Sequence, residues 1–256
     1  MSECYTREYW LTNPGYHLED SEFKAESVAA ALEEIELHSS LRICDVGCGA
    51  GGVLHSLTRL LGESGRAVEA AVGYDISPPA IAKARELFPD VQFEVGSVAD
   101  IAPGWDIILA MDVIEHLEDY YSFLRDLRGK SRFYVFHVPM ELNAFRAVRQ
   151  QEFMEAWDNS AHIHHFCETT VIRAFETTGF ATLRKRWTDV DQQQCRTTLK
   201  RPGWKRRIVN MVRTVLFRVA PGFAVALLGG KSLLLILRDG EGAAVGDQPK
   251  GSLKGE

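Results

Sequence analysis

A cluster of glycines beside an aspartate marks the stretch of the sequence with the clearest chemical meaning. The segment DVGCGAGG, residues 45–52, lies between a short apolar run and a helical pattern. Glycines suit such a turn because a side chain would block both the tight backbone and the close approach of a ligand. Gly47, Gly49 and Gly52 also match the G-x-G-x-x-G spacing of dinucleotide sites, so a nicotinamide or flavin enzyme is one candidate.

Two aspartates bear on which ligand this loop would hold. Asp45 precedes the first glycine by two residues, where its charge would repel a pyrophosphate placed at the helix N-terminus. S-adenosylmethionine, which carries an ammonium and a sulfonium but no phosphate, suits Asp45 better. Asp75 ends a later apolar run in GYDIS, where a carboxylate can accept both hydroxyls of a ribose. Asp75 fits either cofactor.

Acids and histidines in two further segments are candidates for proton transfer. They are Asp112, Glu115 and His116 in AMDVIEHLED, and His162, His164 and His165 in HIHHF. A histidine that removes the proton of an oxygen acceptor contributes about 10²- to 10⁴-fold in rate. His165 is our first candidate for this base and His116 the second. The alternative for His116 is a hydrogen-bonded structural histidine, and for the HIHHF cluster it is that at least one histidine only packs or faces solvent.

Alternating apolar runs and helical patterns predict how these residues are positioned. Strands are expected at 41–46, 69–75, 91–96, 105–110, 131–138, 181–190 and 231–239, and helices at 23–37, 53–61, 78–88, 119–127, 140–157 and 169–179. Ser77 suits a helix N-cap and Pro78 the first helical position. Strands that alternate with helices at this spacing predict a parallel sheet with helices on both faces.

Length and composition favour one α/β domain in the cytoplasm. The chain has 256 residues and a net charge of -6, its start MSECYTREYW lacks the pattern of a signal peptide, and its five cysteines show no metal-site or disulfide spacing. We expect an N-terminal helical cap at 1–38, the main domain at 39–239 and a disordered tail at 240–256.

Four segments in order resemble the successive motifs of class I S-adenosylmethionine-dependent methyltransferases. They are ICDVGCGAGG, GYDISPPAIAKA, FEVGSVAD and WDIILAMDVIEHLED, over about residues 41 to 120. The resemblance implies the Rossmann-like methyltransferase fold, which is a seven-stranded, mostly parallel, doubly wound sheet with helices on both faces and an antiparallel last strand. In motif order the chain is similar to the ubiquinone-biosynthesis O-methyltransferases.

This resemblance also assigns residues to the cofactor. Asp45, Gly47 and Gly49 would hold the methionine moiety, Asp75 the ribose, Ile76 the adenine face, Ser97 and Val98 the adenine edge, and Asp112 would lie near the methyl group. The family often has an acid where this chain has Ser97. The aromatic N-terminal residues Tyr9, Trp10, Tyr16 and His17 resemble a segment that shapes the acceptor pocket in related enzymes, although they could simply cover the sheet edge.

A divalent metal is a further possibility that the resemblance raises. Asp112, Glu115 and His116, with His165, resemble the E-x-x-E-H constellation and distal histidine that hold a metal in ubiquinone-biosynthesis and small-RNA methyltransferases. Asp112 replaces the first Glu and shortens its reach. We therefore expect a metal-free site, and these four residues are the candidates if Mg²⁺ or Mn²⁺ is bound.

A basic insert at about 203–229 predicts contact with an anionic membrane surface or a lipophilic acceptor. Between Asp191 and Asp239 the sequence has ten Lys and Arg residues and no acid. Ile208, Val212, Val215 and Val219 recur at helical spacing on one side, which is typical of an interfacial helix. The alternative is a crossover helix whose apolar stripe packs on the sheet. The protein as a whole is acidic, so no nucleic-acid partner is expected.

The sequence thus favours a methyltransferase that acts on a small molecule, with oxygen as the preferred acceptor atom and nitrogen or carbon left open. Two rival hypotheses remain. One is a noncatalytic S-adenosylmethionine-binding regulatory subunit, and the other is an NAD(P)-dependent dehydrogenase. Neither the acceptor nor the oligomeric state follows from the sequence.

Overall fold

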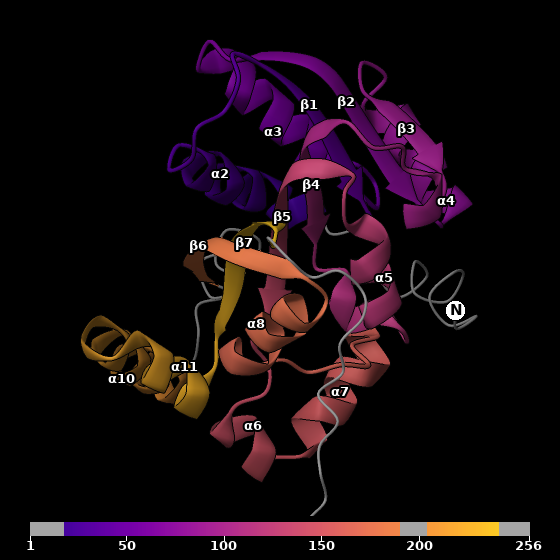
Figure 1. Cartoon of the computed structure of the whole chain (residues 1–256). Coiled ribbons are helices and arrows are strands. Elements are labelled where there is room, and N and C mark those ends of the chain that lie inside the picture. Colours follow the sequence, from indigo (N-terminus) through magenta and orange to yellow (C-terminus); the bar gives the residue numbers. More distant parts are fainter. Residues whose placement is uncertain (1–17, 190–203, 241–256) are drawn as a thin grey trace, which may run out of the picture.

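A seven-stranded sheet forms the centre of the computed structural model, which describes residues 18–189 and 204–240 (Figure 1). Its strands are β1 (Ser40–Val46), β2 (Ala67–Asp75), β3 (Gln92–Val95), β4 (Trp105–Met111), β5 (Ser131–Pro139), β6 (Phe180–Asp189) and β7 (Lys231–Asp239). Their order is β3-β2-β1-β4-β5-β7-β6. Strands β1 to β5 pair in parallel, and β7 is antiparallel to both β5 and β6. The predicted sheet is confirmed.

Helices cover both faces of this sheet. On one face, α2 (Ser21–Leu32), α3 (Gly52–Glu63) and α4 (Pro78–Leu87) bury apolar side chains against the strands. On the other face, α5 (Tyr120–Leu127) and α8 (Glu168–Thr177) do the same. Three short 3-10 helices, η1 (Leu18–Asp20), η2 (Val98–Asp100) and η3 (Ile114–His116), complete the elements near the strand ends. The doubly wound arrangement follows from these two apolar layers.

The local signals at the start of α4 act as expected. The Ser77 hydroxyl accepts a hydrogen bond from the Ala80 N–H at 3.4 Å, and Pro78 is the first helical residue. Helix α2 packs into the same core as α3, so the described part of the predicted cap at 1–38 is a covering helix of the sheet. Residues Tyr9, Trp10, Tyr16 and His17, and residues 241–256 of the tail, lie outside the described residues.

The single helix predicted at 140–157 is two helices, α6 (Ala144–Val148) and α7 (Gln151–Ser160). Tertiary hydrogen bonds hold the start of the segment out of the helix, because Met140 N–H donates to Lys231 O and Leu142 N–H to Phe166 O. Asn143 then caps α6 by accepting from Arg146 N–H. The backbone leaves the helical region at Arg149, with φ −106° and ψ 51°.

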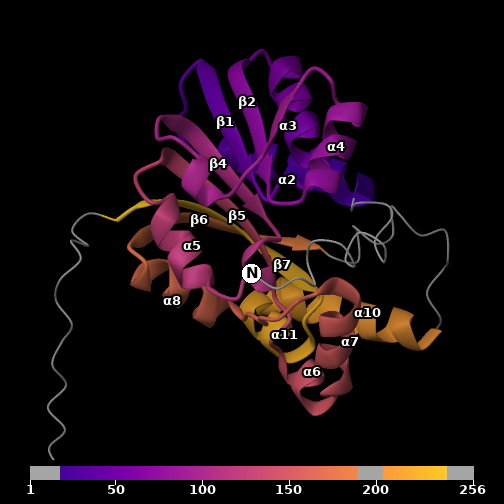
Figure 2. The same cartoon turned by 90° about the vertical axis from the view of Figure 1, so that its right-hand side faces the viewer.

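The basic insert between β6 and β7 forms α10 (Trp204–Val219) and α11 (Pro221–Leu228). Figures 1 and 2 both show these two helices gathered with α6 and α7 at one end of the molecule, away from β2 and β3. We call these four helices the helical lobe. Among the described residues, no helix is both long and apolar enough to cross a membrane.

Candidate functional site

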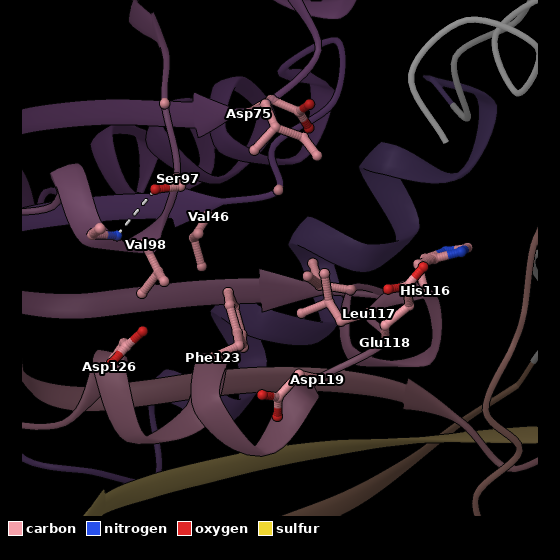
Figure 3. Close-up of a pocket in the computed structure, with 15 residues that line it drawn as sticks. Val46, Asp75, Ser97, Val98, His116, Leu117, Glu118, Asp119, Phe123 and Asp126 are labelled. Carbon is pink, nitrogen blue, oxygen red and sulfur yellow. Dashed lines mark hydrogen bonds between the residues drawn. The ribbon is translucent and has the colours of Figure 1, made fainter. Parts of the chain in front are cut away.

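A pocket of about 370 Å³ opens at the carboxyl ends of the parallel strands (Figure 3). It is lined by residues at or just after the ends of β1, β2, β3 and β4 and by residues of α5. They are Val46, Gly47, Asp75, Ile76, Gly96, Ser97, Val98, Ala99, Val113, His116, Leu117, Glu118, Asp119, Phe123 and Asp126. The pocket thus brings together six of the predicted site residues, namely Gly47, Asp75, Ile76, Ser97, Val98 and His116.

The glycine loop forms one wall through its backbone. Gly47, Gly49 and Gly51 all have positive φ, at 73°, 54° and 80°, a region that side chains disfavour. The N–H of Gly47 donates to Tyr74 O at 2.8 Å, which fixes the loop on the end of β2. A Cβ at Gly47 would lie 2.7 Å from Val113 Cγ2, so this position also needs glycine for space.

Asp75 connects this loop to the next strand. Its Oδ2 accepts from Gly49 N–H at 2.9 Å and its Oδ1 from Ser77 N–H at 2.8 Å. Burial raises the pKa of Asp75, and the two backbone N–H groups partly offset that effect. Each carboxylate oxygen has two lone pairs, so both oxygens keep acceptor capacity for the hydroxyls of a ribose.

Asp45 lies below the loop at the end of β1, where it is 1% exposed. Burial and the nearby charge of Asp75 raise the pKa of Asp45 to about 8, and Lys24 acts in the opposite direction. Its Oδ1 has no hydrogen-bond partner among the described residues. A buried carboxylate oxygen without a partner is costly, so a cationic group of a ligand would stabilise it.

Asp112 belongs to a buried network that includes two residues not foreseen from the sequence. Its Oδ2 lies 2.7 Å from Lys24 Nζ of α2, and its Oδ1 lies 2.5 Å from His137 Nδ1 of β5. Burial would raise the pKa of Asp112, but His137 and Lys24 hold it well below the usual range. Lys24 also pairs with Asp20 at 3.0 Å, and His137 Nε2 lies 2.8 Å from Thr188 Oγ1. Asp112 itself has φ 55°.

Ser97 and Asp100 organise the pocket wall after β3. The Asp100 carboxylate accepts from the N–H of Ser97 at 2.7 Å and from its hydroxyl at 3.0 Å. The hydrogen bonds from Ser97 lower the pKa of Asp100. The family often has an acid at the position of Ser97. This chain has a carboxylate three residues later, at Asp100, and that carboxylate is hydrogen-bonded to Ser97 within the pocket wall.

The histidine segment is fastened to η3 beside the pocket. The N–H groups of Ile163 and His164 both donate to Glu115 O, at 2.9 and 3.1 Å. His116 lines the pocket, its Nδ1 lies 3.0 Å from Ala161 O, and its ring stands edge-on to His162 at 4.9 Å. Because a carbonyl oxygen only accepts, Nδ1 of His116 must carry the proton, and Nε2 is then the basic nitrogen of the neutral ring.

Glu141 orients two other histidines of this segment. Its Oε2 lies 2.9 Å from His162 Nδ1 and 3.0 Å from His165 Nδ1, and its Oε1 lies 2.7 Å from Arg146. Burial would raise the pKa of Glu141, but the hydrogen bonds from both histidines and the charge of Arg146 lower it. His165 packs against Phe153 and is not among the residues that line the pocket.

Comparisons with known proteins agree with this geometry. The profile of a family described as "Methyltransferase domain" matches residues 16–185. The chain belongs to the methyltransferase domain family. S-adenosylmethionine is the cofactor of class I methyltransferases, and the pocket lies at the strand ends, next to the glycine loop.

Among curated relatives of this chain, the ubiquinone biosynthesis O-methyltransferase of Rhodopseudomonas palustris (strain BisB5) is 37% identical over 93 residues, which make up 34% of each chain. The trans-aconitate 2-methyltransferase of Methylobacterium nodulans is 32% identical over 110 residues, 42% of this chain and 41% of that protein. The chain thus spans about a third of the length of the first of these relatives.

Solved structures share the fold over most of their length. Magnesium protoporphyrin IX methyltransferase from Synechocystis PCC 6803, with bound SAH, has a TM-score of 0.55 at 15% identity and covers 86% of this chain and 84% of its own. The cyclopropane synthase MmaA2 from Mycobacterium tuberculosis has a TM-score of 0.59 at 13% identity, over 84% and 83% of the two chains. At such identities the likeness concerns the fold.

The residues named as metal candidates are not all gathered in one place. Asp112 is held by Lys24 and His137, and His165 by Glu141. In the described part of the chain, the ligand atoms of Glu115, His116 and His162 lie within 4.8 Å of one another. Glu115 is fully buried, burial and the charge of Asp112 raise its pKa well above the usual value, and neither carboxyl oxygen has a described hydrogen-bond partner.

Sequence reasoning missed Lys24, His137 and Glu141. His137 interrupts an apolar strand in FYVFHVP, which is a signal that could have been used, because a titratable group in a buried strand needs a partner. Lys24 lies in a helix with many acids and gave no comparable signal. Glu141 was placed within a predicted helix, whereas its position outside α6 brings it to the histidines.

Proposed function

We propose that this methyltransferase transfers the methyl group of S-adenosylmethionine to an oxygen atom of a small biosynthetic molecule. One observation carries the cofactor assignment. A pocket at the strand ends has Asp75 on its wall with unused acceptor capacity, and Asp45 below its glycine loop has a buried oxygen without a described partner. A ribose and a cationic amino group would satisfy these two carboxylates.

The roles of the residues follow from their positions. When bound, the cofactor supplies an electrophilic methyl carbon, and most of the rate then comes from holding the acceptor oxygen in line with it. The glycine loop and Asp75 orient the cofactor. Asp112 directly precedes Val113, which lines the pocket, and its contacts with Lys24 and His137 fix the backbone at this part of the wall. No metal is required for these roles.

His116 is the better supported of the two proposed bases. It lines the pocket, and its Nδ1 donates to Ala161 O, which leaves Nε2 as the nitrogen that can take the acceptor proton. His165 was our first candidate from the sequence, but its Nδ1 contacts Glu141 and it does not line the pocket. We keep it as the second proposed base. A base is needed for an oxygen acceptor because its proton must leave before or during methyl transfer.

The O-methyltransferase and trans-aconitate relatives favour an oxygen acceptor, either a phenol or a carboxylic acid. A noncatalytic regulatory subunit would share the cofactor pocket, but it would not need a tautomerically defined histidine on its wall. A dehydrogenase would place a pyrophosphate beside Asp45, whose negative charge would repel it.

We further propose a cytoplasmic location with peripheral membrane contact.

Asp75→Asn tests the cofactor site. An amide has one oxygen, so it cannot accept from both Gly49 and Ser77 and also bind a ribose. Loss of charge-assisted hydrogen bonds, at about 1.5–3 kcal/mol each, predicts a Kd for S-adenosylmethionine at least tenfold higher by calorimetry. Asp90→Asn, at an exposed carboxylate after α4, is the matched control and should bind as the parent does.

If Asp75→Asn binds the cofactor as tightly as the parent, the pocket is not the cofactor site. If S-adenosylmethionine gives no heat with the parent but NADH does, the dehydrogenase hypothesis replaces ours. The acceptor is then sought with isotopically labelled S-adenosylmethionine and cell extract, followed by mass spectrometry. Binding without transfer to any extract component would support the regulatory subunit.

A further inference from the structure

Most of the exposed large apolar side chains of the described protein lie on or next to the helical lobe, whereas elsewhere such side chains are mostly buried. Among the described large hydrophobic residues that are exposed, only Leu87 and Val95 lie outside residues 142–227. The largest values belong to Val148 of α6 and Val219 of α10, at 85% and 81% exposure. Scattered apolar side chains are ordinary on a protein surface, but their concentration on one group of helices indicates an interaction surface.

In α10, the described residues of the predicted apolar stripe are exposed, whereas the side chain of Ile208 lies outside the described ones. Val212, Val215 and Val219, spaced at three and four residues, are all exposed. The helix packs mainly on α11, and its partly buried side includes Phe217, which lies against Trp187 and beneath Lys231. The stripe of a crossover helix would be buried on the strands, so the alternative drawn from the sequence does not describe this helix.

Two neighbouring helices extend this apolar surface. Helix α11 contacts both α10 and α6. It exposes Phe223 and Leu227, and α6 exposes Phe145 and Val148. We call the surface of α6, α10 and α11 the docking face. Helix α7 also exposes Trp157, but it carries the exposed acids Glu155 and Asp158, and we place it outside this face.

The charge beside the docking face is basic. Helix α10 contains Lys205, Arg206, Arg207, Arg213 and Arg218 and no acid, in a protein whose net charge is -6. A second copy of this chain bound through the same face would bring these like charges together. An anionic lipid surface would attract them, at roughly fivefold in partitioning for each basic residue close to the membrane.

We propose that the docking face binds the surface of an anionic phospholipid membrane, with its exposed apolar side chains inserted among the headgroups and the exposed Arg218 on the lipid phosphates. The apolar helices are too short to span the bilayer, so the protein lies on it. This binding does not depend on methyl transfer.

Co-sedimentation with vesicles tests the proposal. The parent protein should sediment with vesicles of phosphatidylcholine and phosphatidylglycerol at low salt and remain in the supernatant with phosphatidylcholine alone. Val215→Asp/Val219→Asp should reduce binding at least roughly tenfold, because two exposed apolar groups become anionic. Leu87→Asp makes the same change at an exposed apolar residue of α4 and should bind as the parent does. Arg218→Glu should weaken binding at low salt and matter little at high salt.

Calorimetry with S-adenosylmethionine on each variant shows whether the cofactor site is intact, and it also separates this proposal from the proposed function. The proposal is overturned if the parent ignores anionic vesicles at low salt, or if the double variant binds them as well as Leu87→Asp does. It is also overturned if sedimentation velocity shows a parent dimer that the double variant breaks, without vesicle binding, since the docking face would then hold a second copy of the chain.

Discussion

Lys24 lies against both Asp112 and Asp20, and Lys24→Met should therefore destabilise the protein strongly. Its Nζ lies 2.7 Å from Asp112 and 3.0 Å from Asp20, and the residue is 6% exposed. Removing one partner of a buried ion pair costs about 3–5 kcal/mol, since the other charge stays buried. In a protein of this size that corresponds to a fall in Tm of roughly 6–20 °C.

Urea unfolding followed by circular dichroism measures this loss, with Lys83→Met as the control. Lys83 pairs with Glu86 at 3.0 Å on the surface of α4, where a pair contributes about 0–1 kcal/mol. Asp112→Asn fits the positive φ of residue 112, because asparagine tolerates this region. The double variant Lys24→Met/Asp112→Asn should lose at least about 1 kcal/mol less than the sum of the single variants.

The same pair predicts a pH dependence. The pKa of Asp112 is held well below its usual value in the folded protein, so its contribution is present above the unfolded pKa of about 3.9 and is lost as the pH falls below it. The difference in unfolding free energy between the parent and Lys24→Met should therefore shrink at acid pH. A loss under about 1 kcal/mol at pH 7, or additive single variants, would refute the role given to Lys24.

Three further predictions concern the pocket and its surroundings. Burial and the charge of Asp75 raise the pKa of Asp45 to about 8, so its contribution to stability is fully present below about pH 3.9 and is lost as the pH rises through 8. Asp45→Asn should therefore flatten the dependence of stability on pH between about pH 4 and 8 in urea unfolding, and an unchanged slope would contradict this. Gly47→Ala should cost about 1–3 kcal/mol in thermal unfolding because of its φ of 73° and the 2.7 Å approach to Val113, whereas Gly62→Ala, in open space on α3, should be neutral or stabilising. Full methyl transfer is expected after exhaustive EDTA dialysis, and activity lost to EDTA but restored by Mg²⁺ or Mn²⁺ would assign a metal to Glu115, His116 and His162.

The sheet and the cofactor wall could be predicted because each depends on short-range patterns. Asp75 follows an apolar run and precedes a Ser-Pro helix start, so its place at a strand end is encoded within a few residues. The partners of Asp112 could not be predicted in this way. Lys24 and His137 lie far from it in the chain, and only the packing of α2 and β5 brings them to it. Glu141 was missed because tertiary hydrogen bonds override the helical pattern at 140–143.

Ala161 joins the helical lobe to the pocket through a very short stretch of backbone. It has φ 53°, its N–H donates to Trp157 O at the end of α7, and its carbonyl is the acceptor for His116 Nδ1. The next two N–H groups after His162, those of Ile163 and His164, are held by Glu115 O. A shift of α7 against the sheet would therefore fall on Ala161 and His162, so the carbonyl of Ala161 links the position of the lobe directly to the orientation of the imidazole on the pocket wall.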